Sequence, residues 1–177
     1  MKTSRTLPVF LALFLITSSC GLFDDLQEIS FDGEIPVNFF VNETADNPDG
    51  KAYSAEQLLD IKDDPDIAEY ASKIKDVKVN SVTYYVYDLA GSGVIFSGGS
   101  IVSLSNNKTV ATLTNLPLVE SANGNFSIDN TGLNELSTRL KNNKSETIRL
   151  QGNLSKTPVS FYVECRFHVT ITADALK

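Results

Sequence analysis

The stretch FYVECRFHVTI, residues 161–171, decides the fold class of this 177-residue chain. Apolar and polar side chains alternate along it from Phe161 to Ile171. Successive side chains of a β-strand point to opposite faces, so the alternation predicts a strand with one face in a core and the other toward solvent. Cys165 falls on the apolar face and His168 on the polar face. We therefore expect Cys165 to be a packing residue and His168 to be a solvated one.

The same period of two recurs elsewhere in the chain and predicts further strands. They are expected at residues 29–41, 77–89, 94–104, 109–115, 125–129 and 146–154, separated by turn-forming Gly and Asn residues. Pro36 has no amide hydrogen to donate, which indicates an edge strand or a position without a backbone hydrogen bond to its neighbour. The apolar parity changes near Asn80 and Ser81, which indicates a β-bulge there. The segment 53–61 fits either a helix or an extended strand.

Two short helices are expected between the strands. Asp64 before Pro65 is typical of a helix N-cap followed by proline at the first helical position, and the apolar stripe then runs through residues 67–74. A second helix is expected at 133–141. Many short strands with helices only as connections indicate a mainly β protein, a two-sheet antiparallel β-sandwich with immunoglobulin-like topology.

The first twenty residues have a different character. Lys2 and Arg5 precede an apolar run at 7–16, which is about half the length that crosses a bilayer. Thr17 and two serines then lead to Cys20. This pattern resembles the signal of bacterial lipoproteins, whose lipobox ends in the cysteine that receives lipid, although leucine is commoner than threonine at the position of Thr17. The resemblance implies cleavage before Cys20 and a lipid on it.

The resemblance also implies a division of the chain and a location. Residues 1–19 are then the signal peptide, 20–28 the lipidated cysteine with a short tether, and 29–177 a single β-sandwich domain. A membrane anchor at Cys20 implies the cell envelope, and outer membrane is favoured because Gly21 is not acidic. The periplasmic and surface-exposed faces both remain open. The body is similar in layout and length to small sandwich lipoproteins of Gram-negative envelopes, a likeness that transfers no site.

The net charge argues against one class of partner, and the cysteine content limits the possible disulfides. The full chain has 15 basic and 22 acidic residues, a net charge of −7. Cleavage would remove two basic residues and no acidic one, which leaves −9. Nucleic-acid binding needs Lys and Arg to neutralise phosphates, so we expect no nucleic-acid partner. With lipid on Cys20 only Cys165 remains, which excludes an intrachain disulfide.

Three groups of side chains are candidate functional sites. Tyr84, Tyr85 and Tyr87 crowd one strand and make a candidate ligand-binding platform, although packing explains them too. His168 is the only histidine, so a Ser-His-Asp set would need a serine such as Ser160 from across a sheet. The acidic cluster within 60–69 suggests either calcium ligands or helix caps, and capping is the simpler explanation. We expect no catalytic residue, no metal and no cofactor.

These observations favour a non-catalytic binding or interaction module for a glycan or an envelope protein. The first alternative is a structural or assembly subunit of a surface complex, and the second is a hydrolase. The geometry of the structure discriminates between the binding module and the assembly subunit. An exposed tyrosine face favours ligand binding, whereas an unpaired apolar strand edge favours assembly by strand addition.

Overall fold

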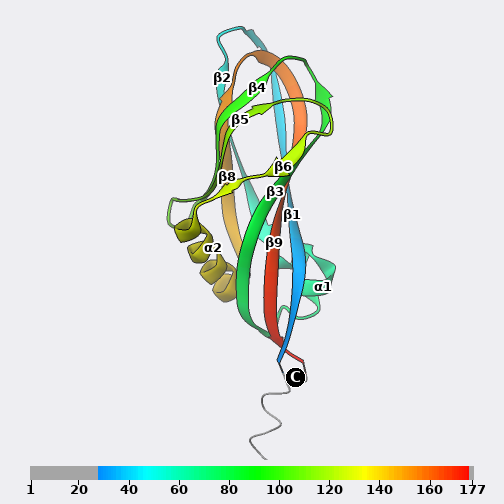
Figure 1. Ribbon diagram of the computed structural model, residues 1–177, viewed down its shortest axis with the longest axis vertical. Coiled ribbons are helices and arrows are strands. Elements are labelled where there is room, and N and C mark those ends of the chain that lie inside the picture. Colours follow the sequence, from blue (N-terminus) through cyan, green and yellow to red (C-terminus); the bar gives the residue numbers. More distant parts are fainter. Residues whose placement is uncertain (1–27, 176–177) are drawn as a thin grey trace, which may run out of the picture.

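A computed structural model describes residues 28–175 as two packed antiparallel β-sheets with a helix beside them (Figure 1). The elements are β1 (Glu28–Asn47), β2 (Lys51–Asp60), the 3₁₀ turn η1 (Ile61–Asp63), α1 (Pro65–Ala68), β3 (Ile74–Ala90), β4 (Ile95–Ser103), β5 (Lys108–Pro117), β6 (Asn123–Asn125), β7 (Ser127–Ile128), α2 (Asn130–Asn143), β8 (Ser145–Leu154) and β9 (Thr157–Asp174). Sheet A has the order β1-β9-β3-β6, and sheet B has the order β2-β8-β4-β5-β7.

The expected two-sheet antiparallel sandwich is confirmed, but the strand order is not that of an immunoglobulin domain. In an immunoglobulin domain the first two strands are neighbours in one sheet. Here β1 and β2 lie in different sheets, and β1 pairs with the last strand, β9. Without the two-residue β7, the two orders are those of a jelly roll. The turn at Asn47–Lys51 carries the chain from one sheet to the other, which separates the first two strands.

Strand β9 has the alternation expected of it. Its odd-numbered residues from Phe161 to Ile171 are buried in the core between the sheets, and Cys165 is fully buried. Burial raises the pKa of the Cys165 thiol far above its usual range, so the thiol is neutral and packs as a small apolar group. Because β9 lies between β1 and β3, its even-numbered residues form the centre of the outer face of sheet A.

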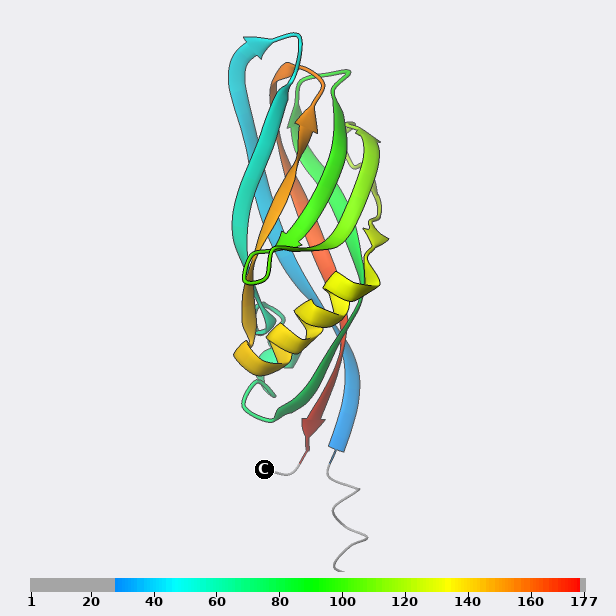
Figure 2. The same cartoon turned by 90° about the vertical axis from the view of Figure 1, so that its left-hand side faces the viewer.

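The molecule is elongated along its strands, and both described chain ends lie at one end of it. Glu28 at the start of β1 pairs with Asp174 at the end of β9. The connections β1–β2, β3–β4 and β8–β9 gather at the opposite end (Figure 2). The predictions made for residues 1–27, including Cys20, lie outside the described residues. No helix of the described part has the length and apolarity to cross a membrane.

The helices differ from expectation in length. Asp64 caps α1 as expected, with its carboxylate accepting from the amides of Asp66 and Ile67, but α1 has only four residues because Ile74 already belongs to β3. Helix α2 begins earlier than expected, at Asn130, because Asp129 caps it. Its leucines at 133, 136 and 140 are buried, as the periodicity predicted.

Several local predictions about the strands are confirmed. The pairing of β3 with β9 shifts register between Val79 and Ser81, at the predicted bulge. Pro36 lies in β1, which is an edge strand of sheet A. The ambiguous segment 53–61 is extended up to Asp60, because β2 pairs with β8 along its whole length from Lys51 to Asp60, and Ile61 begins the turn η1. Tertiary pairing decides the conformation where local propensity leaves two choices.

Candidate functional site

The three candidate tyrosines of β3 divide between the two faces of sheet A. Tyr84 points toward the core, where it packs partly buried and contacts Phe126 edge-to-face at a centroid distance of 5.6 Å. Tyr85 and Tyr87 lie on the outer face, because alternate residues of a strand point to opposite sides. The platform hypothesis therefore keeps Tyr85 and Tyr87 and loses Tyr84, which is a packing residue.

Two further rings extend Tyr85 and Tyr87 into what we call the aromatic row, made of Phe40, Tyr162, Tyr87 and Tyr85. Phe40 of β1 pairs with Tyr162 of β9, which pairs with Tyr87 of β3. The centroid distances are 4.6 Å for Phe40–Tyr162, 5.1 Å for Tyr162–Tyr87 and 6.0 Å for Tyr87–Tyr85, with neighbouring planes within 26° of parallel. Three strands thus assemble one stacked surface.

The aromatic row is partly exposed and ends in polar groups. Phe40 is 46% exposed and Tyr85 is 38% exposed. The Tyr87 hydroxyl donates to Asn38 Oδ1 at 3.1 Å, and the Tyr85 hydroxyl donates to Ser121 Oγ at 3.2 Å. Partial desolvation, aided by the nearby Glu164 carboxylate, raises the pKa of Tyr87, so its hydroxyl remains a neutral donor. The row presents both apolar ring surface and fixed hydroxyls to solvent.

A depression of about 480 Å³, which we call the central depression, borders the row at Tyr85. Its other lining residues are Thr83, Tyr84, Asn123, Gly124, Asn125 and Arg166. It forms where β6, only three residues long, pairs with β3 at Thr83–Tyr85. Amide, hydroxyl and guanidinium groups therefore line an open hollow beside an exposed ring.

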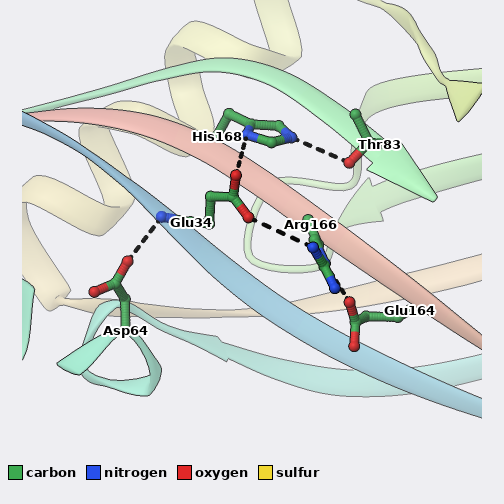
Figure 3. A network of polar contacts seen from close by, with 6 residues as sticks. All are labelled: Glu34, Asp64, Thr83, Glu164, Arg166 and His168. Atoms are coloured by element: carbon green, nitrogen blue, oxygen red, sulfur yellow. Dashed lines mark hydrogen bonds and ion pairs between the residues drawn. The ribbon is translucent and has the colours of Figure 1, made fainter. Parts of the chain in front are cut away.

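A charged network continues the outer face toward the paired chain ends (Figure 3). Arg166 Nε donates to Glu164, and Arg166 Nη1 lies 3.8 Å from Glu34 Oε2. The hydrogen bond to Glu164 raises the pKa of Arg166, so the guanidinium stays charged. A second hollow of about 420 Å³, the proximal depression, is lined here by Glu34, His168 and five other residues from β1, β3 and β9.

His168 is not simply solvated as expected, because it lies between a carboxylate and a hydroxyl. Its Nδ1 lies 3.3 Å from Glu34 Oε1, and its Nε2 lies 3.1 Å from Thr83 Oγ1 (Figure 3). The serine considered as its partner, Ser160, lies eight residues away on the same strand. Thr83 lies in a strand paired on both sides, so its backbone amides face neighbouring strands and not the depression. The arrangement orders the imidazole but supplies no backbone oxyanion hole at Thr83.

The free edge of β1 is protected at three positions. The amide of Glu34 donates to Asp64 Oδ2 at 2.7 Å, so the even-numbered residues of β1 direct their backbone groups away from the sheet. Pro36 has no amide hydrogen, and the carbonyl of Phe40 accepts from the Tyr53 hydroxyl at 3.1 Å. These devices block strand addition along the middle of the edge.

The acidic cluster at 60–69 is explained in part by capping. Asp60 accepts from the amide of Lys62, and Asp64 accepts from the amides of α1 and of β1. Within residues 28–175 no three His, Cys, Asp or Glu side chains are grouped to hold a metal ion.

Sequence reasoning missed Phe40 and Tyr162, although both carry a detectable signal. Each is an aromatic residue on the polar parity of its strand, next to a buried neighbour such as Phe39 or Phe161. Arg166, Asn123 and Asn125 were missed for a different reason. They meet Thr83 only through strand pairing, which a single sequence does not reveal.

Comparisons with known proteins assign no family to the chain. No family model and no curated protein matches it. Among solved structures, the decameric BFDV capsid protein is similar at 7% identity and a TM-score of 0.44, covering 82% of this chain and 99% of that one. Desmodium yellow mottle tymovirus is similar at 9% identity and a TM-score of 0.42, covering 85% of this chain and 89% of that one. Turnip yellow mosaic virus is similar at 11% identity and a TM-score of 0.36, covering 84% of this chain and 97% of that one. Likenesses at this level say nothing about function.

Proposed function

We propose that the protein is a non-catalytic binding module of the cell envelope that holds a neutral glycan on the outer face of sheet A. One observation carries the proposal: the aromatic row meets the central depression at Tyr85, so exposed rings and convergent polar groups form one continuous surface. A sugar ring has apolar C–H faces and hydroxyl edges. It therefore needs aromatic surface and hydrogen-bonding groups side by side.

The polar groups of this face suit hydroxyls. Asn123 and Asn125 each offer a donor and an acceptor, and Thr83 offers a hydroxyl that both donates and accepts. Arg166 is already paired with Glu164, so its remaining N–H groups are held in position without a large uncompensated charge. Ordered donors and acceptors of this kind recognise adjacent hydroxyls at a low entropic cost.

The charge of the face favours a neutral glycan over an acidic one. Asp32, Glu34 and Glu164 lie on it near the single guanidinium of Arg166, and the whole chain is acidic. A polyanionic chain would be repelled, since like charges across an interface oppose binding.

The alternative of an assembly subunit receives less support. Of the strand edges that would favour it, that of β1 is closed along its middle by Asp64, Pro36 and Tyr53. The exposed aromatic surface lies instead on the sheet face, where a ligand contacts rings and not backbone.

The location within the envelope rests on Cys20. With lipid there, the eight residues 21–28 reach at most about 28 Å, and the body then stands on its Glu28 end. The aromatic row lies twelve residues along β1 from Glu28, about 40 Å at the usual rise of a strand. The face would thus be displayed well away from the outer-membrane surface. A Cys20→Ala variant is expected to leave the detergent phase in phase partitioning, and unchanged partitioning would remove the anchor.

The binding test uses the full-length protein purified in detergent. It is passed through gels containing soluble β-glucan, xylan or mannan, with polygalacturonate as the anionic comparison. We expect retardation by at least one neutral polysaccharide and a loss of at least about 100-fold in affinity for Tyr85→Ala combined with Tyr87→Ala. Leu58→Ala, at an exposed position of sheet B, is the matched control. Absence of retardation by all neutral polysaccharides, or equal binding by the double variant, contradicts the proposal.

Hydrolysis is the second candidate, favoured by the contact chain Thr83–His168–Glu34. A hydroxyl, an imidazole and a carboxylate in this order resemble a nucleophile, its base and the orienting acid. The test is hydrolysis of p-nitrophenyl acetate by the purified protein and by His168→Gln. We expect equal background rates from both, and a rate that depends on His168 would replace the non-catalytic assignment.

A further inference from the structure

A third depression lies on the same face of sheet A, beyond the aromatic row. This distal depression, of about 300 Å³, is lined by the ends of β1 and β3 and the start of β9, and its outward residues include Asn42, Thr44, Pro158 and Ser160. The proximal, central and distal depressions therefore follow one another along the strands. The row separates the last two.

Strand β9 gives the order and the spacing of the three depressions. His168 lines the proximal one, Arg166 the central one and Ser160 the distal one, with Tyr162 of the row between Arg166 and Ser160. His168 and Ser160 are eight residues apart, about 26 Å at the rise of an antiparallel strand. The proximal and central depressions lie next to each other, because Thr83 of the central one contacts His168 of the proximal one.

We infer that the face binds an internal stretch of a neutral glycan chain, about five sugar residues long, laid along β9 and its neighbour β3, which together line all three depressions. This rests on the proposed function and specifies its ligand. Each residue of an extended glycan chain is roughly 5 Å long, so about five residues span the roughly 26 Å of β9 between His168 and Ser160. Each depression alone is shallow and offers few groups, so affinity must come from contacts repeated along the chain. Aromatic contacts at the row would hold the middle of the stretch.

The first test is a length series. Cello-, xylo- and manno-oligosaccharides of two to eight residues are titrated calorimetrically into the full-length protein in detergent. For the class whose polysaccharide is retained, affinity is expected to rise by about 100-fold from two to five residues and to change less than about twofold from six to eight. Equal affinity for two and six residues overturns the inference but leaves the proposed function intact. A lack of binding to every oligosaccharide and polysaccharide defeats both.

The second test fills the distal depression. Ser160→Trp is expected to weaken binding of a hexasaccharide by about tenfold while leaving a trisaccharide within about twofold, because only the longer chain reaches beyond the row. Ser54→Trp, on an exposed position of β2, is the matched control and should change neither. Asn42→Trp, on edge strand β1 of the same depression, replaces Ser160→Trp if that variant does not fold. Unchanged hexasaccharide binding by a folded variant contradicts the inference.

Discussion

The outer faces of the two sheets share one geometry but carry different surfaces. On sheet A, stacked rings from three strands adjoin a network of Glu34, Arg166 and His168. On sheet B, the described residues show an exposed Arg149–Glu56 ion pair and two exposed aliphatic side chains, Leu58 and Ile95, but no pair of contacting rings. Neither outer face belongs to the core between the sheets, so both can carry polar side chains. A stable sandwich therefore does not require exposed rings, and their concentration on sheet A needs another explanation.

The largest effect should come from removing the ring at the centre of the row. Tyr87→Ala loses stacking on both Tyr162 and Tyr85, which we expect to cost about 1–3 kcal/mol of unfolding free energy. Affinity for the retained polysaccharide should fall about 100-fold. Leu58→Ala should stay within about 0.5 kcal/mol. Urea unfolding and affinity electrophoresis measure the two quantities, and similar losses from both variants would break the distinction between the faces.

A buried carboxylate on the inner side of sheet B should have the next largest effect. Glu146 accepts from the hydroxyl of Ser103 at 2.8 Å and from the amide of Ser105 at 2.9 Å. We expect Glu146→Gln to cost about 2 kcal/mol, since hydrogen bonds to a charged acceptor are among the stronger ones. Polysaccharide binding should be unchanged, because this carboxylate holds structure and faces no ligand. Altered binding with unaltered stability would contradict that role.

The same carboxylate predicts a pH dependence. Burial opposes its ionisation, but the hydrogen bonds from Ser105 and Ser103 outweigh burial and hold the pKa of Glu146 below its ordinary 4.5. A depressed pKa stabilises the folded state above the unfolded value, and that contribution is lost as the pH falls through the folded value. As the pH falls from about 5 through the folded-state pKa of Glu146, the free energy of unfolding of the wild type should therefore decrease more than that of Glu146→Gln. Parallel curves would contradict this assignment.

Protection of the β1 edge should give a smaller effect. Asp64→Ala removes the cap of α1 and the acceptor for the Glu34 amide, which we expect to cost about 1 kcal/mol. The freed edge should also increase self-association, visible as concentration-dependent elution in size-exclusion chromatography. Asp66→Ala, in the first turn of the same helix, is the control. Equal behaviour of the two variants would show that Asp64 does not guard the edge.

The smallest stability effects should come from one arginine on each face. Arg166→Ala and Arg149→Ala each remove an exposed ion pair, worth less than about 1 kcal/mol. Only Arg166→Ala should weaken polysaccharide binding, by about tenfold, because Arg166 lines the central depression. If the two variants bind equally well, the central depression is not part of the binding surface.

Sequence patterns among residues close in the chain predicted many features of the strands and helices correctly. The alternation of β9, the bulge near Ser81, the edge position of Pro36 and the cap at Asp64 all depend on residues close in the chain, and all are confirmed. The extent of α1 was not foreseen. Its apolar stripe continues beyond Ala68, but the need of β3 to pair with β9 from Ile74 onward ends the helix early.

The sequence by itself therefore determined which side chains face the core, because alternation is a property of each strand alone. It also determined that Tyr85 and Tyr87 share a face. Only the tertiary structure decided which strands are neighbours, and hence a jelly-roll order in place of the immunoglobulin-like one. Alternation states which face of a strand is buried but not which strand lies beside it. For that reason the aromatic row, drawn from β1, β9 and β3, exists only once these strands have paired.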